Sequence, residues 1–217
     1  MFALYHYKRK DYPFNRYNPL SALGSVSLGA SNPLGKNGDF IPIVCRRKGQ
    51  VHRLHISIDD VKIAPQGVSF DSTQYGDRSE AHITLTESQE RELLNLIKLH
   101  ESELALKYDD MKDSPHMITE VLTTGGVTLQ VKMKSTTQSD SLWEGNATLE
   151  DKVRALNGCT QSVSVALFVS GYYYSTKQAT ARLCISLEEV NTGKNKNKKK
   201  RHLHSITAGS DIKKMRK

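Results

Sequence analysis

From Phe40 onward, the apolar residues of this chain recur mainly at every second position. They alternate with polar residues, which is the pattern of a strand with one buried and one solvent-facing side. Four segments carry it, with the apolar sets Leu54, Ile56 and Ile58; Val127, Leu129, Val131 and Met133; Val163, Val165, Leu167 and Val169; and Ala181, Leu183, Ile185 and Leu187. A chain with this periodicity is expected to fold mainly as β-sheet.

Two details of the sequence predict an irregularity in one strand and the pairing of two others. Val61 and Ile63 resume the alternation after Asp59-Asp60, which predicts a bulge between two stretches of strand. The last two segments flank a turn, which predicts a closing antiparallel hairpin.

One segment has helical spacing instead. Thr86-Glu87-Ser88-Gln89 has the form of a capping box, and apolar residues then recur at intervals of three and four. This predicts a helix over 87–107 with a charged outer face. Its predicted buried face consists of Leu93, Leu94, Ile97, His100 and Leu104.

A second, shorter helix is predicted after Thr148, which can cap it, with Asn157-Gly158 as its end. Its apolar face holds Leu149, Val153 and Leu156. A short helix just before the last two strands suits a five-stranded Greek-key barrel of the oligonucleotide-binding (OB) type, and βαβ alternation is absent. The sequence thus predicts a mainly β fold, an antiparallel Greek-key OB-like barrel with an inserted helix.

Composition divides the chain into three parts. Residues 1–39 are rich in Gly and Pro, with seven of the chain's twenty, and are predicted to be an extended N-terminal arm without regular structure. Residues 40–190 are predicted to form a single OB-like domain, and residues 191–217 a disordered basic tail. The tail has ten basic residues and one acid, a net charge of +9; because the whole chain carries +8, residues 1–190 sum to −1.

The tail is typical of a nuclear-localisation signal or of a tether to a polyanion. Its main basic run is Lys194, Lys196, Lys198, Lys199, Lys200 and Arg201. No apolar run reaches the ~18 residues that span a bilayer, and the N-terminus lacks the features of a secretion signal. We therefore expect a nuclear protein (in the host nucleus if viral), otherwise a cytoplasmic one, without membrane contact.

Enzymatic signatures are weak. Asp60-Val61-Lys62 has the D-x-K spacing of some nucleases, with Asp39 as a candidate metal ligand, but matches this short are common by chance. The histidines and cysteines lack zinc spacing, and phosphate-binding glycine loops and nucleophile turns are absent. The sequence favours a non-enzyme with no cofactor and no metal.

The polar faces of the strands carry the binding hypothesis. If the apolar sets face the core, the opposite faces present a cationic, hydrogen-bonding surface on a slightly acidic body. Its basic members are Arg53, His55, Lys132, Lys134 and Arg182.

Aromatic residues near the closing hairpin add to this surface. Tyr172, Tyr173 and Tyr174, followed by Lys177, can stack on bases, although neighbouring tyrosines in a strand point to opposite faces. Packing against cross-strand neighbours explains them equally well. Trp143 is a stacking candidate if exposed, but its large apolar area favours burial.

The N-terminal arm has a similar composition. Aromatic rings alternate there with cations that include Lys8, Arg9 and Lys10, a mixture suited to stacking on bases while neutralising phosphates. The alternative is that these rings pack on the body or on another subunit.

The closing segment also resembles a known class of protein. Residues 148–190, a short helix followed by SVSVALFVSGYYYSTKQATARLCISLEEV, resemble the C-terminal half of the OB-fold single-stranded DNA-binding proteins of large DNA viruses and some phages. The resemblance covers a fifth to a third of the chain and implies coating of single strands without sequence preference in replication and recombination. Many proteins of this type end in an acidic tail, whereas this chain ends in a basic one.

The leading hypothesis is a non-enzymatic protein that binds single-stranded nucleic acid, DNA rather than RNA, and can form a homo-oligomer. The alternative is a viral structural, assembly or interaction protein with a basic nuclear-localisation tail. An RNA-binding suppressor or movement-type protein is a third reading, which a preference for the 2′-hydroxyl would distinguish.

Overall fold

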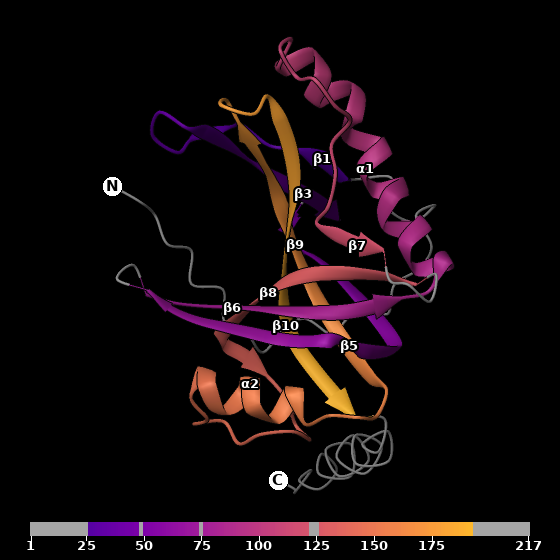
Figure 1. The fold of residues 1–217 in the computed structure, drawn as a ribbon. Helices are drawn as coiled ribbons and strands as arrows, with labels where there is room; N and C mark the ends of the chain where they lie inside the picture. The colour runs from indigo at the N-terminus through magenta and orange to yellow at the C-terminus, as the bar shows by residue number, and fades with distance from the viewer. Residues whose placement is uncertain (1–25, 48–49, 74–75, 122–125, 193–217) are drawn as a thin grey trace, which may run out of the picture.

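The computed structural model describes residues 26–47, 50–73, 76–121 and 126–192, which form a mainly β structure with two helices (Figure 1). The elements in chain order are β1 (Val26–Leu28), β2 (Asn32–Pro33), β3 (Gly38–Arg47), β4 (Gln50–His52), β5 (Leu54–Thr73), β6 (Gly76–Leu85), α1 (Glu87–Lys107), β7 (Thr119–Val121), β8 (Val127–Gln138), α2 (Leu149–Asn157), β9 (Val163–Ser175) and β10 (Thr180–Thr192).

Five of the strands form a ring. Each is hydrogen-bonded to the next in the order β5, β6, β8, β10 and β9, and β9 pairs with β5 again. All of these pairs are antiparallel except β8 with β10, which is parallel. The prediction of an antiparallel sheet is therefore wrong for this pair: the chain forms α2 and β9 between β8 and β10, and β10 returns in the direction of β8.

The remaining strands extend the ring at two places. β3 pairs with the β9 segment beyond the ring and carries β1, β2 and β4, while β7 pairs with β8. Strands β9 and β10 consequently run the length of the molecule, from their hairpin beside β3 to the end near α2 (Figure 1). They connect the ring to the β3 sheet.

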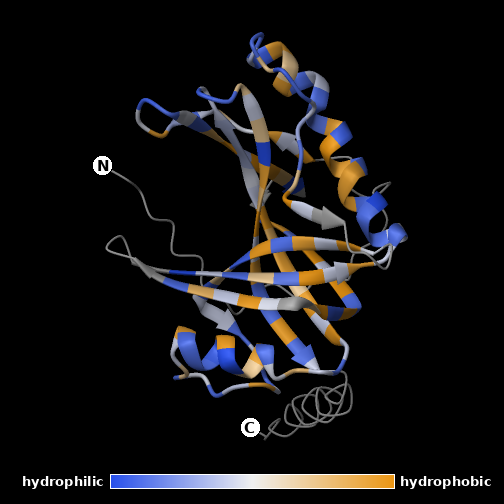
Figure 2. Ribbon diagram, viewed as in Figure 1, coloured by the Kyte–Doolittle hydropathy of each residue, from blue (hydrophilic) through white to orange (hydrophobic). Residues whose placement is uncertain are grey.

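The four predicted apolar sets lie in the core, except for Val127, which is half-buried. Figure 2 shows hydrophobic and hydrophilic residues alternating along the ring strands. Burying one such side chain stabilises the fold by about 1.5–3 kcal/mol. A shift of one residue in the pairing register of a strand would expose a whole apolar set and is therefore strongly disfavoured. The hydrophobic period therefore sets which residues face outward.

The predicted bulge is confirmed inside β5. The pairing of β5 with β9 shifts between Ile58 and Val61, and Asp60 has a φ of 61°. The shift absorbs the Asp59-Asp60 pair and returns Val61 to the core, where it is 1% exposed.

Helix α1 has the predicted limits. Thr86 and Gln89 form both hydrogen bonds of the capping box. The buried face differs from the prediction at one position, because Leu96 is buried and Leu94 is 39% exposed. Spacing by threes and fours allows either leucine, and only the packing of α1 decides between them.

Helix α2 is capped at Thr148, and Asp151 completes a second capping box. Asn157 is its last residue, as predicted. Its side chain bridges to β5, accepting from the Val68 N–H at 2.6 Å and donating to the Val68 carbonyl at 3.1 Å. Gly158 has a φ of −79°, so this helix ends without a left-handed glycine.

The predicted boundaries need correction at both ends of the domain. Residues 26–39 contain β1, β2 and the start of β3, so the prediction of an arm without regular structure is wrong for this part. Gly29 and Gly35 lie in the connections between these short strands, whereas Pro33 and Gly38 belong to β2 and β3. β10 reaches Thr192, past the predicted end at 190. The arm residues Lys8, Arg9 and Lys10 and the tail from 193 lie outside the described residues. Neither described helix is long and apolar enough to cross a membrane.

Candidate nucleic-acid interface

A row of four residues crosses the outer face of the ring. His55 on β5 pairs with Phe168 on β9, Phe168 with Ser186 on β10, and Ser186 with Lys132 on β8. All four lie opposite to the core-facing positions of their strands. The register thus brings His55 and Lys132, both predicted binding residues, into one row with Phe168 between them.

Phe168 is the centre of a cluster. The Arg53 guanidinium carbon lies 5.3 Å from the centroid of its half-buried ring, and the Lys134 Nζ lies 5.8 Å from it. The His55 ring is tilted by 32° against it at a centroid distance of 5.4 Å. Both cations are within range of the ring quadrupole. We call Arg53, His55, Lys134 and Phe168 the Phe168 cluster.

Positive charge on this face is not neutralised by ion pairs with other described residues. Both ion pairs in the described part of the chain are made by Arg154 on α2. Two carboxylates lie nearby: Glu80 pairs in register with Lys132 and accepts from the Gln130 amide, and Glu188 acts on His55. The cations of this face, none of which is in either ion pair, are Arg53, Lys132, Lys134 and Arg182.

Burial lowers the pKa of His55, Glu188 opposes this shift, and the positive charge of Arg53 adds to it. His55 is therefore mainly a neutral, ring-stacking member of the cluster at neutral pH. Burial also raises the pKa of the Cys184 thiol, against the pull of Arg182 and Lys132. This places Cys184 within electrostatic range of both cations.

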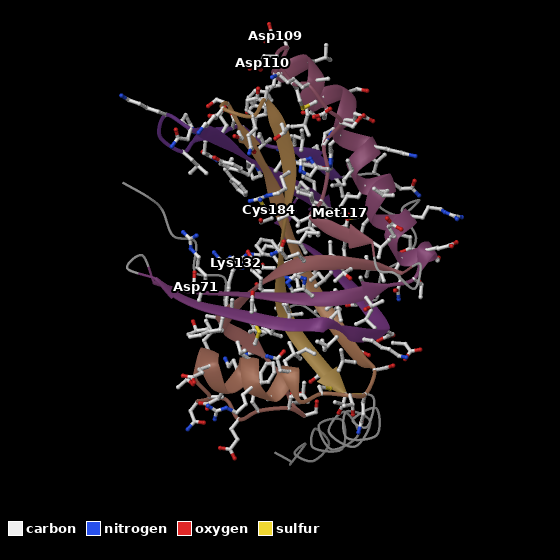
Figure 3. All side chains as sticks on the ribbon, in the orientation of Figure 1. Asp71, Asp109, Asp110, Met117, Lys132 and Cys184 are labelled. Carbon is white, nitrogen blue, oxygen red and sulfur yellow. The ribbon has the colours of Figure 1, made fainter. Side chains whose placement is uncertain are left out.

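Figure 3 shows Lys132 and Cys184 between the β9–β10 hairpin above and the β5–β6 hairpin below, on which Asp71 lies. Arg182 joins this face from β10, where it pairs with Tyr173.

The tyrosine run divides between the two faces of β9. Tyr172 and Tyr174 are 0% and 2% exposed, so the prediction that they stack on bases is wrong. Tyr172 shares a 3.1 Å hydrogen bond with His100 of α1, and Tyr174 stacks on Tyr108 with centroids 3.9 Å apart. Tyr173 points to the opposite face and is half-buried. Cross-strand packing accounts for the first two, and only Tyr173 remains available.

The other aromatic and basic candidates lie elsewhere. Trp143 is half-buried, packs on the core and has the Lys152 Nζ 5.9 Å from its ring, which places it beside α2. Lys177 is exposed in the turn of the β9–β10 hairpin. Neither belongs to the Phe168 cluster.

The D-x-K motif and its candidate metal ligand Asp39 lie far apart. Asp39 pairs with Tyr174 on β9, and Val61, next to Asp60, pairs with Val163 on the same strand. Tyr174 lies eleven positions after Val163 on β9, or roughly 35 Å away at about 3.3 Å per residue. Among the described residues no group of three His, Cys, Asp or Glu side chains could hold a metal ion.

Sequence reasoning missed Phe168 as a site residue. The signal was present: Phe168 occupies an outward position of β9 where the others are small, Ser164, Ala166 and Ser170. Phe40 on β3 was also missed, because only the pairing of β3 with β9 places it beside Tyr173.

A scan of protein-family models and a search of curated proteins both found no match to this chain. The assignment of the site accordingly rests on its geometry.

Proposed function

We propose that the chain is a non-enzymatic protein that binds single-stranded nucleic acid on the outer face of an OB-like barrel. Numbered in chain order, the ring strands follow one another as 1-2-3-5-4 and back to 1, and their one parallel pair is that of 3 with 5. Helix α2 falls between strands 3 and 4. This arrangement supports a five-stranded Greek-key barrel of the OB type.

The observation that carries the proposal is the Phe168 cluster. It combines a half-buried aromatic ring with two cations near that ring, neither of which is in an ion pair with another described residue. A ring offers a surface to any base, and the cations can bind the phosphates on either side of it. Neither cation is in an ion pair with a described carboxylate, so phosphate oxygens of the bound strand would provide their negative partners.

The cluster favours single strands over duplexes. A base inside a duplex is stacked on its neighbours and cannot reach a ring that lies on a protein surface. Lys132 and Arg182 extend the cationic surface across β8 and β10, so phosphates along several nucleotides are within its extent. DNA is the proposed partner, with a role in coating single strands during replication or recombination in the nucleus.

The test is fluorescence anisotropy of the full chain with labelled oligothymidine and with a duplex, over a series of salt concentrations. Phe168→Ala should weaken single-strand binding about tenfold, since a stacked base contributes ~1–3 kcal/mol. Arg53→Ala with Lys134→Ala should reduce the salt slope by up to about 1.4, or about 0.7 for each phosphate that is no longer neutralised.

Lys98→Ala provides the matched control, because Lys98 is exposed on α1, away from the ring face. Its affinity and salt slope should equal those of the unmodified chain. Equal single-strand affinities for Phe168→Ala and Lys98→Ala, with both variants folded by circular dichroism, would rule out the Phe168 cluster as the binding site.

A further inference from the structure

A second aromatic row lies on the same face as the Phe168 cluster, farther along β9. Tyr173 pairs with Phe40 on β3 and with Arg182 on β10. Both rings are half-buried, and Arg182 is exposed. The Tyr173 hydroxyl donates to the Asn37 carbonyl at 3.2 Å, which holds the ring against the β3 sheet.

The pairing with β10 shows that the two rows share a face. Arg182, Cys184 and Ser186 are spaced by two and therefore point the same way. Their partners on β9 are Tyr173, Gly171 and Phe168. Phe168 and Tyr173 are five positions apart, and in a regular strand an odd interval places two side chains on opposite faces. Here the register shift between Cys184 and Ile185 takes up one extra residue of β9, so the two rings lie on the same face.

The β9 and β10 residues that pair between the two rows are small. Ser186 lies four positions after Arg182 on β10, which spaces the rows by about 13 Å. Gly171 has no side chain there and Cys184 is half-buried, with Lys132 and Arg182 close enough to act on its thiol. Small groups with cations beside them leave room for a sugar-phosphate backbone between two stacked bases.

We propose that a bound single strand follows β9, with one base on Phe168 and another on Tyr173 and Phe40, and with its phosphates beside Lys132 and Arg182. This inference rests on the proposed function. It adds a second stacking subsite and the path that the bound strand follows across the protein. The strand then runs along β9, from the ring onto the β3 sheet.

The experiment measures the affinity of the full chain for labelled oligothymidines of about two to about twelve nucleotides, which covers most of the site sizes of OB folds. Tyr173→Leu should bind oligomers longer than about four nucleotides roughly tenfold more weakly and lose much less affinity for the shortest ones. Tyr173→Phe keeps the ring and loses the bond to Asn37, and it should bind like the unmodified chain.

The variants separate the two proposals. If Phe168→Ala weakens binding and Tyr173→Leu does not, the proposed function stands and the path along β9 is overturned. Equal losses for Tyr173→Phe and Tyr173→Leu would also overturn it, because the hydroxyl and not the ring would then matter. If the unmodified chain does not prefer single strands, the proposed function itself fails.

Cysteine alkylation followed by mass spectrometry gives a second readout that does not depend on variants. A strand along β9 should slow alkylation of Cys184 several-fold and leave Cys159, which follows α2, unchanged. Both thiols are free and half-buried. Equal protection of the two cysteines, or protection of neither, would place the bound strand elsewhere.

Discussion

At the scale of single residues, the face of the strand that a residue occupies decides whether it packs in the core or is available to a ligand. Tyr172 and Tyr173 are neighbours in sequence, yet one is buried under α1 and the other lies on the proposed binding face. Phe168 sits among small outward-facing residues on β9, where a large ring is not needed to complete the core.

Gly171 shows how closely β3 approaches β9. Its φ is 154°, and an added Cβ would lie 2.2 Å from the Ile41 carbonyl oxygen. Gly171→Ala should therefore destabilise the fold by about 1–3 kcal/mol, through backbone strain and the displacement of β3. Urea unfolding measures the change. Gly145→Ala is the control, because a Cβ there meets nothing within 4 Å, and equal midpoints for the two variants would contradict this account.

At the scale of elements, helix α1 contacts strand β9 through a buried histidine. His100 is 2% exposed and bonds to Tyr172, and burial lowers its pKa from 6.5 while Glu103 opposes the shift. The folded state therefore favours neutral His100. Its contribution to stability is complete above the unfolded pKa of 6.5 and is lost as the pH falls below 6.5 toward the folded pKa.

We expect the free energy of unfolding to fall between pH 7 and pH 5, by at most about 1.4 kcal/mol per pH unit for this one proton. Denaturant unfolding at several pH values tests this against His100→Gln, which cannot titrate. The pKa of His55 is also lowered, so the difference between the two proteins is the informative quantity. Parallel pH profiles would show that His100 is not the responsible group.

At the scale of the whole molecule, we expect the basic tail and the ring face to have separable roles. Residues 193–217 contain all ten basic residues of the predicted tail, so a chain ending at Thr192 carries a net charge of −1. This truncation keeps β10 whole, whereas a cut at 190 would remove its last two residues.

The truncated chain should bind every oligonucleotide more weakly and still prefer single strands. Its salt slope should be smaller by about 0.7 for each phosphate that the tail neutralises in the full chain. Anisotropy with single-stranded and duplex probes at matched salt measures both quantities. If truncation abolishes the preference for single strands, the tail and not the Phe168 cluster is the source of selectivity.

Local patterns were sufficient for much of this fold. The period of two in β5, β8, β9 and β10 assigned the core faces, and the motifs at Thr86 and Thr148 located the starts of both helices. These features depend on residues a few positions apart, whose geometry is set by the backbone itself. The cationic residues Arg53, His55, Lys132 and Lys134 could be placed on outer faces for the same reason.

What joined those residues into one site was long-range pairing. Only the register of β5 with β9, and of β10 with β8, brings Arg53, His55 and Lys134 around Phe168. The burial of Tyr172 and the placement of Tyr173 beside Phe40 also depend on contacts between distant segments. Periodicity tells which side of a strand a residue faces, but not which strand lies next to it. The sequence alone therefore determined the elements and their faces, and the tertiary structure decided which faces form the candidate site.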